Sequence, residues 1–336
     1  MAVTGIGTQQ DPWIVTNYED FISLSNTRAS VSSNDSYIQF FDNEHPNQVI
    51  DCNSYGSEFK WDTFTAALGD GGTYTPHVVH INLNGCTIKN FLIKEGVPMF
   101  TTQWNSMVGS CSKLIVSNGY IRNVFMGSSG SRLFNNIGYM EFHDISFSVN
   151  NNGSVVTLFD STNDRRIQFD NCALYLAQAK AATSIMAGCD FTDSDFDLNI
   201  GDQNQQSMFP NCSFTDCRFQ GKLGGSPIRA GNYPSFFFTV FGFNTNGAQT
   251  GDTVLTNCVV DIDISDQTPD WSGAQVLFYV PSNGATLNTN IFCNSHCPEG
   301  YNHPSDWNYI SHTLMRNGAY LNNAGFTVVQ VLGSGD

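Results

Sequence analysis

Hydrophobic and polar residues alternate in short runs through the middle of the chain, and these runs share a common phrase. An apolar residue is followed by a polar residue, then by Asn or Gly, then by Cys or another small residue, and then by a second apolar run. The phrase occurs at residues 83–88, 116–121, 169–174, 186–191, 208–219 and 255–260. Alternation with a period of two is typical of β-strands with one buried face, and Asn and Gly are typical of turns. The pattern therefore predicts short strands joined by tight corners.

The phrase recurs at a loose period. Taking the residue before Cys, or its equivalent, as a mark gives positions 85, 119, 144, 171, 188, 211 and 257, with gaps of 34, 25, 27, 17, 23 and 46 residues, the last being twice 23. Short strands repeating at such intervals indicate a solenoid, although alternation with Asn-Gly also describes antiparallel hairpins. Stacked parallel strands are favoured because the marked position carries the same kind of residue in many repeats, as a ladder of equivalent residues between coils requires. Helical windows are also scarce after Leu24, so no crossover helices cover a flat parallel sheet.

The predicted fold is therefore all-β, a right-handed parallel β-helix of about ten coils. We divide the chain into an N-terminal cap with the first strands at 1–76, a β-helix body at 77–270, and the last coils with a less regular C-terminal cap at 271–336. The segments 91–109, 221–235 and 244–252 are candidate insertions between strands, and such insertions tend to gather on one side of a solenoid.

The N-terminal cap combines a strand and a helix. A Gly and Pro turn leads into a short strand at Trp13, Ile14 and Val15. Thr16 and Glu19 then have the spacing of a helix capping box. The hydrophobic residues of this helix that would face inward are Phe21, Ile22 and Leu24. Short strands are expected at 37–41 and 49–51, and loops at 59–76.

Composition narrows the function classes. Hydrophobic residues make up 40% of the chain, which is ample for a core, whereas charged residues make up only 13%. The net charge of -16 repels phosphate backbones, so no nucleic-acid partner is expected. The first residues show no basic start followed by an apolar run, and no apolar stretch reaches membrane-spanning length. We therefore expect neither an export signal nor membrane insertion.

Five of the ten cysteines follow Asn or Gly in the repeated phrase: Cys86, Cys172, Cys189, Cys212 and Cys258. Equivalent positions of stacked repeats lie above one another, and free Cys behaves as a small hydrophobic residue. The spacing predicts a buried column of free thiols, with disulfide bonds as the alternative.

The densest acidic cluster is Asp193, Asp195 and Asp197. In a strand these residues would share one face, with neighbours about 6.6 Å apart, and this lies within the range of about 6.5 to 9.5 Å seen between carboxylates of inverting glycosidases. A β-helix also places carboxylates of adjacent coils at the shorter separation of retaining enzymes, so spacing alone decides nothing. Solvated carboxylates, a cation site and a catalytic pair all stay open. Asp261 and Asp263 are a weaker case of the same kind.

Other candidate groups are less specific. Cys293, His296, Cys297 and His303 have zinc-ligand types, but structural zinc sites have ligands in tighter pairs, so plain thiols are the alternative. His77 and His80 have no nucleophile motif nearby. Three tryptophans in loop-like stretches are candidates for sugar stacking or for burial under a loop: Trp104, Trp271 and Trp307. We assign no catalytic, cofactor-binding or metal-binding residue and expect no cofactor.

The aromatic run at 233–243 is apolar on both strand faces. Such a segment is covered on both sides, either because it folds over the coil as a loop or because it forms a subunit interface.

The opening Gly5-x-Gly7-Thr8-x-x-Asp11-Pro12-Trp13, the following Tyr18-Glu19-Asp20-Phe21, and Leu83 to Asn90 resemble right-handed β-helix proteins of the pectin-lyase-like superfamily, and more specifically virion proteins of tailed bacteriophages. The resemblance implies a capsid-decoration, head-fibre or tailspike protein, commonly a homotrimer, that assembles in the host cytoplasm and lies on the virion surface. The polygalacturonase-like motifs Asn-Thr-Asp, Asp-Asp, Gly-His-Gly and Arg-x-Lys are absent from the sequence. Pectate lyases place a basic residue over an acidic cluster, and the 193–197 segment has none in its own coil.

Two functional hypotheses follow. The first is a non-enzymatic virion structural protein, with other virion proteins as partners and with adhesion to host or mucosal glycans. The alternative is a tailspike-type polysaccharide depolymerase, a glycoside hydrolase or lyase, acting through Asp193, Asp195 or Asp197.

Overall fold

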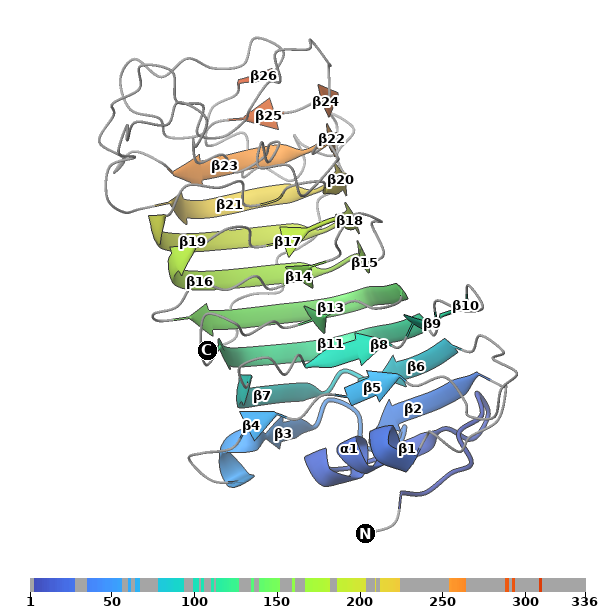
Figure 1. Cartoon of the computed structure of the whole chain (residues 1–336). Helices are drawn as coiled ribbons and strands as arrows, with labels where there is room; N and C mark the ends of the chain where they lie inside the picture. Colours follow the sequence, from blue (N-terminus) through green and yellow to red (C-terminus); the bar gives the residue numbers. More distant parts are fainter. Residues whose placement is uncertain are drawn as a thin grey trace.

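A computed structural model describes the chain at residues 3–27, 35–55, 60–61, 64–66, 78–93, 99–102, 104–105, 110–111, 113–126, 134–135, 139–151, 159–160, 167–181, 186–203, 209, 212–223, 254–263, 288–289, 292–293 and 308–309. Strands dominate these residues, and they stack as successive rungs from the N-terminal end toward the later strands (Figure 1). The described helices are α1 (Tyr18–Thr27) and one 3-10 turn (Cys52–Tyr55). The predicted all-β fold with stacked parallel strands is confirmed.

Nineteen strands form one long sheet, in which the strand pairings between described residues are parallel. Its members are β1 (Trp13–Val15), β2 (Ser36–Phe40), β3 (Val49–Asp51), β4 (Lys60–Trp61), β6 (Val78–Asn82), β7 (Thr87–Ile93), β11 (Lys113–Met126), β13 (Tyr139–Asn151), β15 (Ile167–Asp170), β16 (Ala173–Ala181), β18 (Cys189–Thr192), β19 (Asp195–Gln203), β20 (Ser213–Thr215), β21 (Arg218–Leu223), β22 (Val254–Thr256), β23 (Val259–Asp263), β24 (Asn288–Thr289), β25 (Phe292–Cys293) and β26 (Asn308–Tyr309).

A second, parallel sheet has five strands: β5 (Phe64–Ala66), β8 (Phe100–Thr102), β12 (Phe134–Asn135), β14 (Phe159–Asp160) and β17 (Met186–Ala187). The short pair β9 (Trp104–Asn105) and β10 (Ser110–Cys111) is antiparallel. Strands β4 and β5 lie within 59–76, where loops were expected, and β8 and β9 interrupt the predicted insertion at 91–109. Both predictions were wrong because strands of two or three residues are too short to show an alternating pattern.

Strand register defines the repeat. Along one inward row Ile81 pairs with Val116, and the row continues through Phe142, Phe169, Phe191, Phe214 and Leu255, at spacings of 35, 26, 27, 22, 23 and 41 residues. We call one such repeat a coil. Because Phe214 pairs directly with Leu255, the long final gap is one coil with an insertion, not the two repeats that a gap of twice 23 suggested.

The seven coils from β6 to β23 each turn at a residue in the left-handed conformation, with φ between 48° and 58°. These residues are Asn84, Asn118, Asp144, Asn171, Asp193, Asp216 and Asn257. Asn and Asp adopt this conformation more readily than other non-glycine residues. The corners of two coils therefore lie at Asp193 and Asp216, not at the predicted marks 188 and 211. Gly188 instead lies between β17 of the five-stranded sheet and β18 of the long sheet.

The cysteines of the repeated phrase occupy two different positions in the coil, one after the corner and one at the start of a strand. Cys172, Cys217 and Cys258 each directly follow a corner residue, and Cys86 follows Asn84 after one intervening residue, Gly85. Ser194 occupies the same position in the coil between Cys172 and Cys217. Cys189 begins β18 and pairs with Ile167, and Cys212 immediately precedes β20, so the predicted shared position was wrong for these two. The predicted burial of free thiols is confirmed for all five residues named from the sequence.

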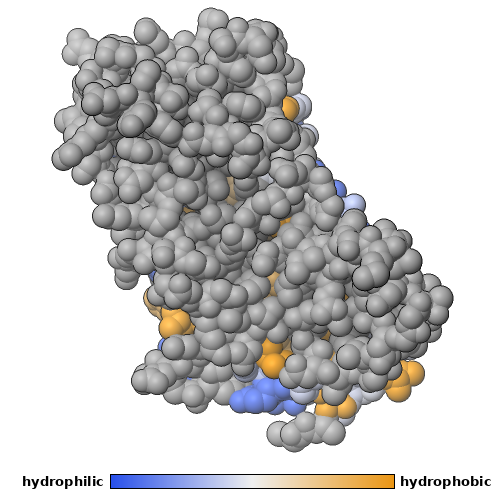
Figure 2. Space-filling view, viewed as in Figure 1, coloured by the Kyte–Doolittle hydropathy of each residue, from blue (hydrophilic) through white to orange (hydrophobic). Residues whose placement is uncertain are grey.

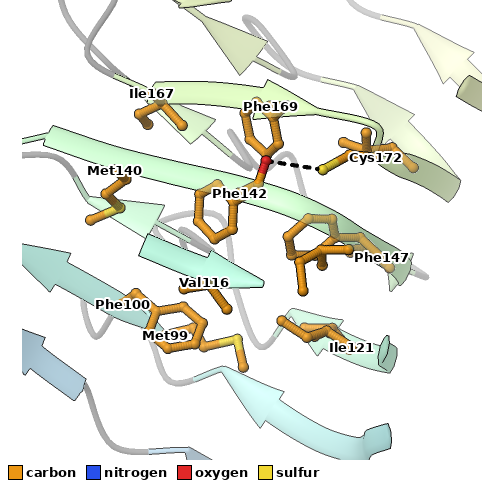
Figure 3. Close-up of a cluster of buried hydrophobic side chains, with 14 of the residues drawn as sticks. Met99, Phe100, Val116, Ile121, Met140, Phe142, Phe147, Ile167, Phe169 and Cys172 are labelled. Carbon is orange, nitrogen blue, oxygen red and sulfur yellow. Dashed lines mark hydrogen bonds between the residues drawn. The ribbon is translucent and has the colours of Figure 1, made fainter. Parts of the chain in front are cut away.

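The core is a column of aromatic rings between the sheets. Phe142, Phe169, Phe191 and Phe214 stack with centroid separations of 5.0, 4.5 and 5.0 Å. A second inward row contributes Phe147, which meets Phe142 edge to face at 5.5 Å. In the close-up the rings of Phe142, Phe147 and Phe169 gather with Val116 and Met140, and the Cys172 thiol points at the Phe142 carbonyl (Figure 3). Stacking of like residues follows from the parallel register, which places equivalent positions above one another.

Helix α1 packs against the hydrophobic core through one face. Phe21 and Leu24 are buried and Ile22 is partly buried against the core, as the sequence predicted. Phe21 packs on Phe40 with a centroid separation of 5.1 Å. The capping residues differ from the prediction by one position. Asn17, not Thr16, accepts a hydrogen bond from the Asp20 amide at 2.9 Å, and its own Nδ2 donates to the Asp20 carboxylate at 2.8 Å. No helix in the described part of the chain is long and apolar enough to span a membrane.

Exposed large hydrophobic side chains in the described part are few and lie on separate segments: Ile6, Val49, Phe125 and Tyr139. At the N-terminal end of the space-filling view, hydrophobic and hydrophilic groups alternate and form no single apolar area (Figure 2).

Candidate functional site

The acidic cluster predicted from the sequence lies on β19 and at the corner before it. Asp195 and Asp197 alternate with the inward-facing Phe196 and Leu198, so they share the outward face of β19. Asp193 does not share that face, because it is the corner residue, with φ of 48°. The three carboxylates therefore have three different surroundings.

Asp195 is held by a cation on the next coil. Register pairs Asp195 with Arg218 on β21. Arg218 Nε donates to Asp195 Oδ1 and Arg218 Nη2 donates to Asp195 Oδ2, each at 3.1 Å. This two-point arrangement matches the planar fork of the guanidinium to the carboxylate. Asp195 is only 3% exposed although it lies on the outward face.

Burial dominates the protonation behaviour of Asp195. Removal of the carboxylate from water raises the pKa of Asp195 to about 6, even though the charge of Arg218 and its hydrogen bonds lower it. A carboxyl group with such a pKa resembles a general acid in its titration. Reaching a substrate is a separate requirement, and both Asp195 oxygens accept hydrogen bonds from Arg218 in a buried position.

Asp197 is half-buried and surrounded by amides. Gln220 Nε2 donates to Asp197 Oδ2 at 3.3 Å, and Asn199 Nδ2 donates to Asp197 Oδ1 at 3.2 Å. Burial raises the pKa of Asp197, against the opposing effects of Gln220 and Arg218. The carboxylate is thus tied to its own strand and to β21.

Asp193 lies among carboxylates. Its backbone N–H donates to the Thr215 carbonyl at 3.0 Å, and the next corner residue along the solenoid is Asp216. Burial raises the pKa of Asp193, and the negative charges of Asp216 and Asp170 raise it further. In the described part of the chain no group of three or more His, Cys, Asp or Glu side chains is arranged to hold a metal ion.

A second outward network lies on β11, β13 and β15. His143 lies 3.4 Å from both Glu141 and Asp170, and Lys113 forms an ion pair with Glu141. On the first coils, Asn90 Nδ2 donates to Asp51 at 2.9 Å and Lys89 lies 3.4 Å from the same carboxylate. The Asn90 hydrogen bond lowers the pKa of Asp51, more than desolvation raises it. These contacts join neighbouring coils.

Sequence reasoning missed Arg218 as the partner of Asp195. A basic partner was expected only within the same coil, whereas Arg218 lies 23 residues away on the next coil. The available signal was the repeat itself, because a residue one coil away is a direct neighbour in a parallel solenoid.

Where the structure describes the other predicted candidates, they lie on four different strands. His80 lies on β6 and stacks on Tyr37 with a centroid separation of 4.4 Å. Strand β9 contains Trp104, strand β23 contains Asp261 and Asp263, and strand β25 contains Cys293. The remaining candidates lie outside the described residues, namely His77, Trp271, His296, Cys297, His303, Trp307, the aromatic run at 233–243 and the insertion at 244–252.

Comparison with known proteins gives limited results. No protein-family model matches the chain, and no curated protein matches its sequence. One similar solved structure is that of a protein from Bacteroides ovatus provisionally named an immunoglobulin A1 protease. It is 12% identical, with a TM-score of 0.45, over 95% of this chain and 89% of that chain. A likeness at this level carries no argument about the function of this chain.

Proposed function

We propose that the chain is a non-enzymatic structural protein of a bacteriophage virion, a rigid β-helix displayed on the capsid or tail surface. The proposal that the chain is not an enzyme rests on the bidentate contact between Arg218 and Asp195. Asp195 is the candidate carboxylate whose pKa is raised to about 6, and both of its oxygens accept hydrogen bonds from Arg218. Asp197 is likewise engaged by Gln220 and Asn199. The virion part rests on the likeness of the opening motif from Gly5 to Trp13 to phage β-helix proteins.

The proposal includes the finer architecture and the assembly. The solenoid winds to the right through about ten coils, as parallel crossovers usually do, and is closed by an N-terminal strand-helix cap and a less regular C-terminal cap. It forms a homotrimer with other virion proteins as neighbours, assembles in the host cytoplasm, and adheres to host or mucosal glycans through its outward face. The column of stacked Phe rings supports a rod-like role, since it joins successive coils through one continuous core.

Mass spectrometry of density-purified particles tests the virion assignment. The chain should co-purify with capsid and tail proteins at a fixed copy number and should resist washing with high salt. Recovery of the chain only in the soluble fraction of the lysate would exclude the assignment.

A second assay tests the depolymerase alternative. Purified chain is incubated with host surface polysaccharide, and product size is measured by size-exclusion chromatography beside the variant Asp197→Asn. Polysaccharide of unchanged size with both proteins is the expected result. Shortening by the native chain that is lost in the variant would establish an enzyme.

A further inference from the structure

The corner residues form a ladder of amide and carboxylate side chains along the solenoid. Four of the seven left-handed corners carry Asn and three carry Asp, at Asp144, Asp193 and Asp216. An amide both donates and accepts hydrogen bonds, whereas an ionised carboxylate only accepts. At the step between Asp144 and Asn171 the two side chains meet, and Asn171 Nδ2 donates to Asp144 Oδ1.

Between β18 and β21 two successive corners of the ladder carry carboxylates instead of amides. Thr192 pairs with Thr215, so the residues that follow them, Asp193 and Asp216, occupy the same corner position on successive coils. Among the seven described corners, these are the two consecutive ones that both carry a carboxylate. A third carboxylate, Asp170, precedes the corner of the preceding coil and pairs with Thr192.

The charged groups around Asp193 do not compensate for this arrangement. In the described part, the groups that face it are Asp170 at the end of β15 and Asp216 after β20. His143 lies beside Asp170 at 3.4 Å, and Arg218 of β21 is engaged with Asp195 of β19. Burial is the largest cause of the raised pKa of Asp193, and the like charges of Asp216 and Asp170 raise it further.

We propose that Asp193 and Asp216 form a proton-responsive joint between two coils, so that β18 to β21 pack more firmly in mildly acidic than in neutral solution. Protonation of Asp193 removes the repulsion and supplies a hydrogen-bond donor, as Asn171 does for Asp144. A group with a raised folded-state pKa contributes its stability below the unfolded value, and that contribution is lost as pH rises through the folded value. Acidification from neutral pH toward about pH 5 should therefore tighten these coils.

The substitution Asp193→Asn tests the joint, because Asn already occupies the same corner at Asn84, Asn118, Asn171 and Asn257. The matched control is Asp144→Asn, which changes the same corner position where the carboxylate already has an amide donor. Amide hydrogen exchange of peptides covering residues 189–223 is measured at neutral pH and at about pH 5, after correction for intrinsic exchange rates. Peptides from β7 and β11 serve as internal references.

The native chain should show several-fold higher protection of 189–223 in acid than at neutral pH. Asp193→Asn should raise protection at neutral pH and reduce the pH difference, leaving the part that Asp195 contributes, whereas Asp144→Asn should leave the whole difference unchanged. Lower protection at neutral pH in Asp193→Asn, or an undiminished pH difference, would overturn the joint. Calcium chloride is added in a parallel arm, and protection that rises with calcium in the native chain but not in Asp193→Asn would overturn it in favour of a cation site.

Discussion

Arg218 and Asp195 lie on neighbouring coils and face each other through two hydrogen bonds of 3.1 Å. The pair is largely removed from solvent, with Asp195 almost wholly buried and the Arg218 side chain 21% exposed. Formation of such a pair costs desolvation energy that its attraction only partly offsets, whereas loss of one partner leaves an unpaired buried charge. The contact therefore fixes which residues meet across the coils more than it adds net stability.

Removal of the cation should destabilise the chain. Arg218→Met is expected to lower the free energy of unfolding by about 3 kcal/mol at neutral pH, because Asp195 would stay buried without its partner. Chemical denaturation measures this value. Lys222→Met, which removes an exposed cation from the same strand, is the control and should change it by less than about 0.5 kcal/mol. The double variant Asp195→Asn/Arg218→Met should cost clearly less than the sum of the single changes, and additive costs would show that the two side chains do not interact.

The stability of the chain should depend on pH through Asp195. Its pKa is about 6 in the folded chain against 3.8 for the ordinary carboxyl group. Its contribution is therefore complete below about pH 4 and is lost as pH rises through about 6, a change on the order of 3 kcal/mol. Denaturation midpoints between these limits should rise on acidification, and Asp195→Asn should flatten the profile. Asp42→Asn is the control, because the His45 hydrogen bond lowers the pKa of Asp42 and confines its effect to more acidic solution. An unchanged slope in Asp195→Asn would contradict the assignment.

Truncation of one ring in the Phe column should be costly. Phe191 stacks between Phe169 at 4.5 Å and Phe214 at 5.0 Å. Phe191→Ala is expected to lower the free energy of unfolding by about 3 to 5 kcal/mol, because it removes buried area and leaves a cavity between coils. Phe191→Leu should cost about half as much. The exposed neighbour Thr192→Ala serves as the control, and a cost below about 1 kcal/mol for Phe191→Ala would show that the column is not closely packed.

The corner thiols should be chemically inert in the folded chain. Burial raises the pKa of Cys172 to about 12, so the reactive thiolate is scarce at neutral pH. Iodoacetamide labelling followed by mass spectrometry should modify Cys172 only after denaturant is added. Rapid labelling of Cys172 under native conditions would contradict its burial.

The same position should accept serine. The Cys172 thiol donates to the carbonyl oxygens of Phe142 and Asp170, each at 3.4 Å, and Ser194 on the next coil donates to the equivalent Thr192 carbonyl at 2.8 Å. Cys172→Ser should therefore cost about 1 kcal/mol or less, and Cys172→Leu more, because added volume strains a packed site. Thermal denaturation of both variants measures the difference, and equal costs would exclude a donor role for this side chain.

Alternation and corner residues were sufficient to predict an all-β chain of stacked parallel strands from sequence. The strands at β1, β2, β3 and β6 and the helix α1 all follow from local patterns of apolar residues. The position of the corner was harder to predict. The segment 208–219 contains both Asn211-Cys212 and Asp216-Cys217, and alternation fits either. Only pairing with the coils on both sides shows that Asp216 is the corner.

The candidate site was predictable in part. A dense acidic cluster is visible in the sequence, and the shared face of Asp195 and Asp197 follows from strand geometry. Burial of Asp195 and its contact with Arg218 could not be predicted, because both depend on coil length, and coil length varies from 22 to 41 residues along the inward row. An error of one residue in that length would move the partner to the opposite face of the strand.

Cryo-electron microscopy of intact, density-purified particles tests the proposed function most directly. A solenoid with a rung spacing of about 4.8 Å on the capsid or tail surface, into which the described strands fit, is the predicted result. Particles that lack such density, from a preparation in which the chain is present only as a free protein, would contradict the account.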